Sequence, residues 1–206
     1  IQLGFTLDTV VNKGVIEGVV SLGLNHDSYD GSHGKLIGVL EGGLGDDTLI
    51  AGKGADLIYG DDGVDSGQDG SDLIDGGLGN DSLHGEGGDD TLIGGAGGDI
   101  LNGGYGRDVF LFRSVSDSTA AQSDLIADLK RPDLIDLSAI DADTATAGDQ
   151  AFHIVAAFTG HAGELVLGYD AASASTYISG DVDGDGVADL VVRVVGDHAT
   201  FTGFAL

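Results

Sequence analysis

Large apolar residues recur at a nine-residue spacing through most of the segment from 42 to 111. Each one sits in the middle of a three-residue run, and six residues rich in Gly and Asp come before that run. A short run with one apolar centre is typical of a strand that buries one side chain, and the Gly-rich half is typical of a turn. The pattern predicts a repeated strand-and-turn unit whose core residues are Leu49, Ile58, Ile74, Leu83, Leu92, Leu101 and Phe110.

The copies keep one strict position, the sixth, which is always Asp. The complete copies are GGLGDDTLI from 42, AGKGADLIY from 51, GQDGSDLID from 67, GGLGNDSLH from 76, GEGGDDTLI from 85, GGAGGDILN from 94 and GGYGRDVFL from 103. Residues 60–66, GDDGVDS, keep the turn half but lack the last two positions, which predicts a missing or shortened strand there. The sixth positions are Asp47, Asp56, Asp65, Asp72, Asp81, Asp90, Asp99 and Asp108.

The turn half of the repeat offers oxygen atoms only. Gly permits backbone conformations with positive φ, so that a tight turn can direct its carbonyl groups inwards, and the sixth position adds a carboxylate. Such oxygen ligands suit a hard cation such as Ca²⁺, whereas zinc or copper would require His or Cys. The predicted carbonyl ligands, at positions one and three, are Gly42, Leu44, Ala51, Lys53, Gly60, Asp62, Gly67, Asp69, Gly76, Leu78, Gly85, Gly87, Gly94, Ala96, Gly103 and Tyr105.

The consensus GGxGxDxUx, where U is a large apolar residue, resembles the RTX calcium-binding nonapeptide. The resemblance implies a parallel β-roll over residues 42–111, with two copies per coil and each ion held between one turn and the turn two copies later. The turns from 42, 60, 76 and 94 would then form one column, and those from 51, 67, 85 and 103 the other. Three gaps in each column imply about six Ca²⁺.

The flanks are predicted to be β structure as well. Degenerate copies, such as VIEGV at 15–19 and IGVLEGG at 37–43, lead into the repeats, and residues 1–41 are expected to be strands that cap the open end of the coil. His26 and His33 are interpreted as solvated cap residues. Residues 112–206 alternate apolar and polar positions, for example in DLIADL at 124–129, and predict strands with Asp-rich turns.

Two segments near the C-terminus carry a second resemblance. AFTGHAGELVLGYD at 157–170 and GDVDGDGVADLVVRVVG at 180–196 resemble the C-terminal part of the serralysin family of secreted metalloproteases. The resemblance implies an antiparallel β region at 112–206 that ends in a secretion signal. The last residues, FTGFAL, resemble the hydrophobic ending of type I export substrates, although Gly203 stands where that family usually has an acidic residue.

A second candidate calcium site lies in the loop that begins at residue 181. Asp181, Asp183 and Asp185 fit the opening of a calcium loop, and Asp189 falls at its ninth position. An EF-hand is not expected, because Val192 stands where a bidentate Glu should be. The alternative is a hairpin turn whose carboxylates bond only to nearby backbone amides.

Composition narrows the possible partners. The 206 residues include 35 acidic and 8 basic side chains, a formal charge of −27, which disfavours nucleic acids and anionic membranes. With no Cys, neither disulfides nor thiolate metal sites are expected, and no apolar run is long enough to predict membrane insertion. A chain that begins at Ile1 and has no Met is interpreted as part of a longer protein.

No catalytic motif appears. HExxH, GxSxG and a nucleophilic Cys are all missing from the sequence, and His153 and His161 are interpreted as structural residues. The predicted function is a non-catalytic, calcium-dependent folding and type I secretion module, extracellular or at the cell surface. Its expected partners are Ca²⁺, the type I secretion apparatus and an upstream domain of the same chain, such as a secreted hydrolase. The alternative is a calcium-dependent polysaccharide-binding or adhesion module.

Overall fold

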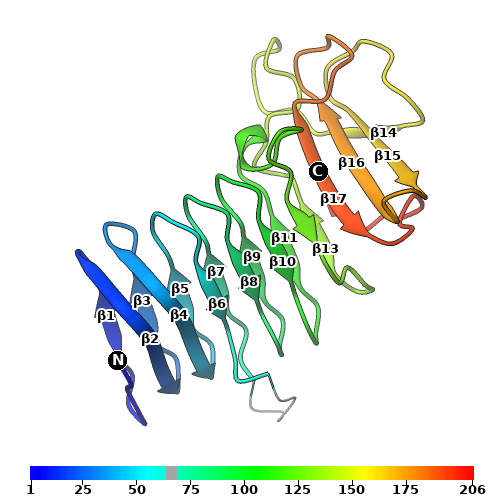
Figure 1. The fold of residues 1–206 in the computed structure, drawn as a ribbon. Helices are drawn as coiled ribbons and strands as arrows, with labels where there is room; N and C mark the ends of the chain where they lie inside the picture. Colours follow the sequence, from blue (N-terminus) through cyan, green and yellow to red (C-terminus); the bar gives the residue numbers. More distant parts are fainter. Residues whose placement is uncertain (64–68) are drawn as a thin grey trace.

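The chain winds into a two-sheet coil that runs from the N-terminus towards a C-terminal cluster of longer strands (Figure 1). The computed structural model describes residues 1–63 and 69–206. The predicted all-β class and parallel β-roll are confirmed, because the short strands of each sheet pair in parallel with the strands one coil away. Within the described residues, the one helical element is the 3-10 turn η1 (Val115–Asp117).

Up to residue 136, consecutive strands belong alternately to the two sheets. In order across the eight-stranded sheet lie β1 (Thr9–Val11), β3 (Ser28–Asp30), β5 (Thr48–Ile50), β7 (Leu73–Asp75), β9 (Thr91–Ile93), β11 (Val109–Leu111), β13 (Leu134–Asp136) and β18 (Phe204–Ala205). Across the ten-stranded sheet lie β14 (His153–Val155), β15 (Glu164–Asp170), β16 (Ser175–Asp181), β17 (Leu190–Val195), β12 (Leu125–Ile126), β10 (Ile100–Asn102), β8 (Ser82–His84), β6 (Leu57–Tyr59), β4 (Lys35–Leu44) and β2 (Val15–Leu24).

The core of the roll is a single file of apolar side chains between the sheets. The central residue of each three-residue strand from β5 to β11 is fully buried, as the nine-residue spacing predicts; these are Leu49, Ile58, Ile74, Leu83, Leu92, Leu101 and Phe110. Each strand therefore buries about one large side chain, worth roughly 1.5–3 kcal/mol. Such a narrow core leaves much of the stability to backbone pairing and to the turns.

Residues 1–41 contribute the end strands of both sheets. β1 and β3 lead into β5, and β2 pairs with β4 in parallel register over ten-residue strands. Their inward side chains, including Val20, Leu22, Tyr29 and Leu40, continue the same file of buried residues. The boundary at residue 42 stays a prediction, since the sheets run through it without a break.

The segment 60–72 changes which turns stack on which. β6 lies in the ten-stranded sheet and β7 in the eight-stranded sheet, and the described residues between them, 60–63 and 69–72, form no strand. Among the described residues, the copies that begin at 60 and 67 therefore contribute one strand, β7, and the first copy lacks the apolar centre that a strand would bury. The predicted assignment of later turns to the two columns was therefore wrong, although turns 67, 85 and 103, and turns 76 and 94, remain neighbours as predicted. Turns 42–47, 85–90 and 103–108 lie on one side with the described residues 60–63 and 69–72, and turns 51–56, 76–81 and 94–99 lie on the other. Asp65 and Gly67 lie outside the described residues.

Beyond Phe112 the roll continues for one more coil and then changes character. β12 and β13 add parallel strands to each sheet, and β17 pairs in parallel with β12. β15, β16 and β17 then form an antiparallel meander of six- and seven-residue strands, as expected for this region. No helix in the described part of the chain is long and apolar enough to cross a membrane.

Candidate metal centre

Aspartates at the end of each turn form two ladders along the roll. In the first column, the backbone N–H of each of these aspartates donates to Oδ1 of the Asp one coil further on. The N···O distances, each from one Asp to the next, are 2.7 Å for Asp8 to Asp27, 2.6 Å for Asp27 to Asp47, 2.8 Å for Asp47 to Asp72, 2.9 Å for Asp72 to Asp90, 3.2 Å for Asp90 to Asp108 and 3.3 Å for Asp108 to Asp133. The second column links Asp56, Asp81, Asp99 and Asp124 in the same way, at 2.8 to 2.9 Å.

Most of these aspartates keep their second carboxylate oxygen without a partner. Within residues 1–63 and 69–206, the buried Oδ2 atoms that accept no hydrogen bond belong to Asp8, Asp27, Asp47, Asp56, Asp72, Asp81, Asp90, Asp99 and Asp124. A buried carboxylate oxygen that has lost its water and gained no donor is costly, and a cation removes that cost. The repeated orphan oxygens fit a series of bound cations.

The first position of each turn brings a carbonyl oxygen to the same place. A methyl group on Gly76 would lie only 2.6 Å from Oδ2 of Asp81 and 2.7 Å from the carbonyl oxygen of Gly94, one coil away. Gly85 stands in the same relation to Asp90 and to the carbonyl oxygen of Gly103. A side chain at position one would fill this space, which explains the glycine. Carboxylate and carbonyl oxygens meet there, the ligand type that Ca²⁺ prefers.

The third positions of successive turns also stack. Lys53, Leu78 and Ala96 pair through parallel bridges on the second column, and Gly87 pairs with Tyr105 on the first. The carbonyl groups of Leu78 and Ala96 each accept a backbone N–H at 2.8 Å, which leaves a second lone pair on each oxygen. The contribution of position three to metal binding therefore stays a prediction.

Burial raises the pKa of most ladder aspartates, because it disfavours their charged form. Desolvation, followed by repulsion from neighbouring aspartates, raises the pKa of Asp72 to about 9 and that of Asp90 and Asp124 to about 8. Burial raises the pKa of Asp47 and Asp81 to about 7 in the same way. In the folded, ion-free roll these carboxyls would hold protons near neutral pH, so a cation that bound there would have to displace them.

Several aspartates of the columns were missed from the sequence. Asp124 and Asp133 extend the ladders past the last full repeat, and Asp8 and Asp27 extend the first column backwards. The C-terminal pair could have been found, because each precedes Leu-Ile as Asp56 and Asp72 do. The two N-terminal turns differ, since Leu3 and Leu22 stand where the repeats have their first Gly. Asp61, within turn 60–72, is also buried, and burial raises its pKa to about 7.

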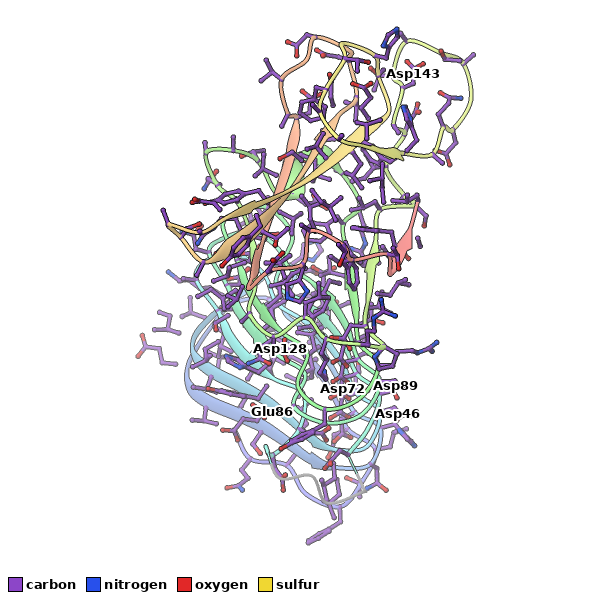
Figure 2. All side chains as sticks on the ribbon, turned by 90° about the vertical axis from the view of Figure 1, so that its right-hand side faces the viewer. Asp46, Asp72, Glu86, Asp89, Asp128 and Asp143 are labelled. Carbon is purple, nitrogen blue, oxygen red and sulfur yellow. The ribbon has the colours of Figure 1, made fainter. Side chains whose placement is uncertain are left out.

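In the view of Figure 2, the labelled acids of the first-column turns lie close together and far from the C-terminal loops. Asp46, Asp72 and Asp89 belong to three successive turns of that column, while Asp143 lies among the loops at the opposite end of the view. Asp46 and Asp89 are position-five residues, and each accepts a backbone N–H from a neighbouring turn. They belong to the outer rim of the turns and not to the orphan-oxygen ladder.

The loop after β16 brings three of its four predicted ligands together. Carboxylate oxygens of Asp181, Asp183 and Asp189 lie within 4.8 Å of one another, and Asp185 is outside that group. Both oxygens of the buried Asp181 accept backbone N–H groups, from Gly184 at 2.7 Å and Gly186 at 2.8 Å. This arrangement matches an Asp-rich turn as well as a cation site, and calcium binding by this loop stays a prediction. No histidine joins a potential metal cluster in the part of the chain that the structure describes.

Two family models match the chain. The model "Peptidase M10 serralysin C terminal" matches residues 75–206, and the model "RTX calcium-binding nonapeptide repeat (4 copies)" matches residues 38–66. The metalloprotease AprA of Pseudomonas entomophila (strain L48) is 44% identical over 91 residues, and the metallopeptidase AprA of Pseudomonas marginalis is 43% identical over 91 residues. Each match covers 44% of this chain and 18% of the relative, so the chain spans under a fifth of these proteins.

Solved structures that resemble the chain in fold and sequence include one RTX-like repeat subunit. It is the solution structure of the AlgE6R2 subunit from the Azotobacter vinelandii mannuronan C5-epimerase, at 30% sequence identity and a TM-score of 0.53. The match covers 76% of this chain and 91% of that one.

Proposed function

The chain belongs to the serralysin C-terminal family of M10 peptidases, and on that premise we propose that it is the calcium-dependent folding and type I secretion module of a larger exported protein. Its RTX repeats bind Ca²⁺, and serralysin-like metalloproteases with such repeats are secreted. The observation that carries the proposal is the double ladder of buried aspartates whose second oxygens have no partner within the described residues.

Six ions are proposed. The gaps from Asp72 to Asp90, from Asp90 to Asp108 and from Asp81 to Asp99 agree with the predicted columns, and the other three gaps differ. Three lie in the first column, between the carboxylates of Asp47, Asp72, Asp90 and Asp108. Three lie in the second, between those of Asp56, Asp81, Asp99 and Asp124. Each ion takes carboxylate oxygens from two turns, and within the repeats it also takes the carbonyl oxygen at position one of the later turn.

The proposed switch follows from the electrostatics of these gaps. Without a cation, folding must either bury charged carboxylates or keep them protonated, and the narrow core does not offset that cost at neutral pH. With Ca²⁺, each gap gains charge neutralisation and fixed oxygen ligands, so binding and folding are one equilibrium. Extracellular calcium modules commonly work at about 10⁻⁴ to 10⁻³ M, a range that would leave the chain unfolded in the cell and folded outside.

The remaining parts of the proposal concern the parent protein. The chain itself is proposed to be non-catalytic, and the upstream domain to be a secreted hydrolase such as a serralysin-like metalloprotease. The ending FTGFAL is proposed as the export signal. In the folded chain it contains β18, which pairs with β13. Gly203 is needed there for space, since a side chain would lie 2.8 Å from the carbonyl oxygen of Asp133. An extracellular or cell-surface location follows from this role.

The test is a calcium titration followed by far-UV circular dichroism, with Mg²⁺ as the control ion. We expect a cooperative gain of β structure at submillimolar to millimolar Ca²⁺ and none with Mg²⁺, because Mg²⁺ dehydrates reluctantly and demands a smaller octahedral site. A full β spectrum in the presence of a chelator would refute the folding switch. Fusion of residues 1–206 to a passenger, with and without FTGFAL, tests export separately.

A second candidate function is calcium-dependent polysaccharide binding. The observation that favours it is the similarity to the AlgE6R2 subunit, which belongs to an enzyme that acts on mannuronan. Retention of the calcium-loaded chain on an alginate column, abolished by free alginate, would support this function. Passage at the void volume under the same conditions would exclude it for this polymer.

A further inference from the structure

We propose that the ammonium group of Lys130 takes the place of a calcium ion at the C-terminal end of the first column, between Asp108 and Asp133. The inference rests on the proposed function, because it assumes that the earlier gaps of the same column hold Ca²⁺. It assigns a cation site in which the cation is part of the chain.

The geometry places the ammonium between two buried carboxylates. Nζ of Lys130 lies 3.2 Å from Oδ2 of Asp108 and 3.5 Å from Oδ1 of Asp133. Both carboxylates are fully inaccessible to solvent, while the Lys130 side chain is 38% exposed and reaches in from the surface. The backbone N–H of Lys130 donates to the other oxygen of Asp133 at 2.9 Å, which fixes the turn around the pair.

Asp108 is the exception among the repeat aspartates. Its Oδ2 has the same position beside its own first glycine, Gly103, as Oδ2 of Asp90 has beside Gly85. Yet Oδ2 of Asp90 accepts no hydrogen bond within residues 1–63 and 69–206, whereas Oδ2 of Asp108 accepts one from Lys130. The orphan oxygens therefore stop in the first column at the point where lysine enters.

The end of the second column provides the matched contrast. Asp99 and Asp124 repeat the relation of Asp108 and Asp133, with a backbone N–H donated to the later carboxylate. There, Oδ2 of both aspartates remains without a partner among the described residues. Two equivalent ends of the roll thus differ in whether an internal cation is present.

In the turn that carries Lys130, side-chain oxygens accept hydrogen bonds that backbone carbonyl oxygens accept in the repeats. Residues 127–133, ADLKRPD, contain no glycine. In the repeats, the N–H of Gly43 donates to the carbonyl oxygen of Gly60 in the next turn. In the last gap, the N–H groups of Gly103 and Gly104 donate instead to the two oxygens of Asp128, at 2.9 and 2.8 Å. The turn replaces a carbonyl ligand with a carboxylate and an ion with an ammonium group.

The test counts bound calcium. Lys130→Met removes the charge and keeps the approximate length of the side chain. Lys130→Gln also removes the charge but keeps a polar group at the end of the side chain. Arg131→Gln is the matched control, because it deletes a neighbouring positive charge that makes no ion pair with the column among the described residues. Isothermal titration calorimetry and equilibrium dialysis with radioactive calcium measure the stoichiometry of each protein.

We expect one more Ca²⁺ per chain in both Lys130 variants than in the wild-type and Arg131→Gln proteins. An unchanged stoichiometry in folded Lys130 variants would overturn the inference while leaving the proposed function intact. If the wild-type chain binds no calcium at all, the proposed function fails first, and the two failures are thereby distinguished.

A measurement on the wild-type chain covers the case in which neither variant folds. An amine-acylating reagent modifies lysines at rates that peptide mass spectrometry can follow residue by residue. In calcium-saturated protein, we expect Lys130 to react at least tenfold more slowly than the exposed Lys13 and Lys53, because its ammonium is held between two carboxylates. Equal reactivity of the three lysines would show that the ammonium is not held, and would overturn the inference.

Discussion

The roll and the C-terminal meander differ in what their strands and turns bury. In the roll, each strand of three residues buries one large side chain, and the turns bury a carboxylate with an orphan oxygen. In the meander, β15, β16 and β17 are six or seven residues long and bury several apolar side chains, among them Leu165, Ile178, Val192 and Val194. The meander's core is apolar, whereas the turns of the roll bury carboxylate oxygens that have no hydrogen-bond partner among the described residues.

The two regions also treat their buried acids differently. Glu164, at the start of β15, accepts the hydroxyl and the backbone N–H of Thr159, and these hydrogen bonds hold its pKa below the usual value. Asp72 in the roll accepts one backbone N–H, and burial raises its pKa to about 9. An acid whose charge is solvated by donors stabilises its region at neutral pH. An acid without enough donors destabilises the region until a cation arrives.

Removal of calcium should therefore separate the two regions, and this is the largest effect expected. In excess chelator at pH 7.5, amide hydrogen exchange should become fast throughout residues 42–111, because the ion-free turns cannot hold ionised carboxylates. The amides of β15 and β16 should stay protected, since their hydrogen bonds lie within the antiparallel meander. Hydrogen-exchange mass spectrometry resolves the two regions. Simultaneous loss of protection in both would mean that the meander has no stability of its own.

A single carboxylate shared by two gaps should have the next largest effect. Asp72 lies between the ions proposed next to Asp47 and Asp90, so Asp72→Asn weakens two sites at once. At calcium concentrations about ten times the dissociation constant, each lost ion costs roughly 1.4 kcal/mol, or about 3 kcal/mol for two. Urea unfolding in calcium measures the loss.

The control for Asp72→Asn is Asp170→Asn, at the exposed end of β15, where the carboxylate bonds only to its own turn. This substitution should change the free energy of unfolding by less than about 0.5 kcal/mol. Equal effects of the two substitutions would contradict the proposal that Asp72 binds calcium.

Much of the roll could be predicted from its sequence, and the reasons are local. The spacing of Leu83, Leu92 and Leu101 defines both the strands and the core, and Asp at position six defines the turns. Stacking could not be read in the same way past residue 60. The choice of partner turn depends on whether residues 60–66 complete a strand, and a defect in one copy shifts every later copy to the opposite side of the roll.

The ends of the columns lie outside the nine-residue consensus for a different reason, although the Asp-Leu-Ile triplets at 124–126 and 133–135 match the second half of the repeat. Asp124 and Asp133 occupy ladder positions without any glycine-rich turn before them, so the nonapeptide consensus does not include them. Lys130 reads as an ordinary solvated lysine in the sequence. Its position between Asp108 and Asp133 depends on a turn whose path is set by backbone N–H groups that donate to the carboxylates of Asp128 and Asp133.

Changes of pH should move the stability of the roll in opposite directions with and without calcium. The folded, ion-free roll binds more protons than the unfolded chain, because the pKa of Asp81, Asp90 and Asp72 rises from 3.8 to about 7, 8 and 9. Its stability is thus full below about pH 4 and is lost as pH rises through about 7 to 9. In chelator, acidification from pH 8.5 to 5.5 should increase the β signal in circular dichroism.

With calcium present the sign reverses, because protons compete with Ca²⁺ for the same carboxylate oxygens. The calcium midpoint for folding should rise on acidification from pH 8.5 to 5.5, in the same titrations. A midpoint that does not depend on pH would mean that the ion-free chain takes up no protons between pH 8.5 and 5.5. That result would contradict a protonated, folded, ion-free roll.

The smallest effect is expected in the loop after β16, and it tests whether the meander has a calcium site after all. Asp183 contributes an exposed carboxylate to the group formed with Asp181 and Asp189, and its Oδ1 accepts only the N–H of Asp185, at 3.1 Å. If the loop binds calcium, Asp183→Asn should lower the stoichiometry by one ion and leave the roll's folding midpoint unchanged. If the loop is an Asp-rich turn, the stoichiometry should stay the same and the unfolding free energy of the meander should fall by under about 1 kcal/mol. Asp181→Asn cannot make this distinction, because both Asp181 oxygens accept backbone N–H groups that hold the loop together in either case. The exposed Asp183 is therefore the residue at which an ion ligand and a turn-forming side chain give different results.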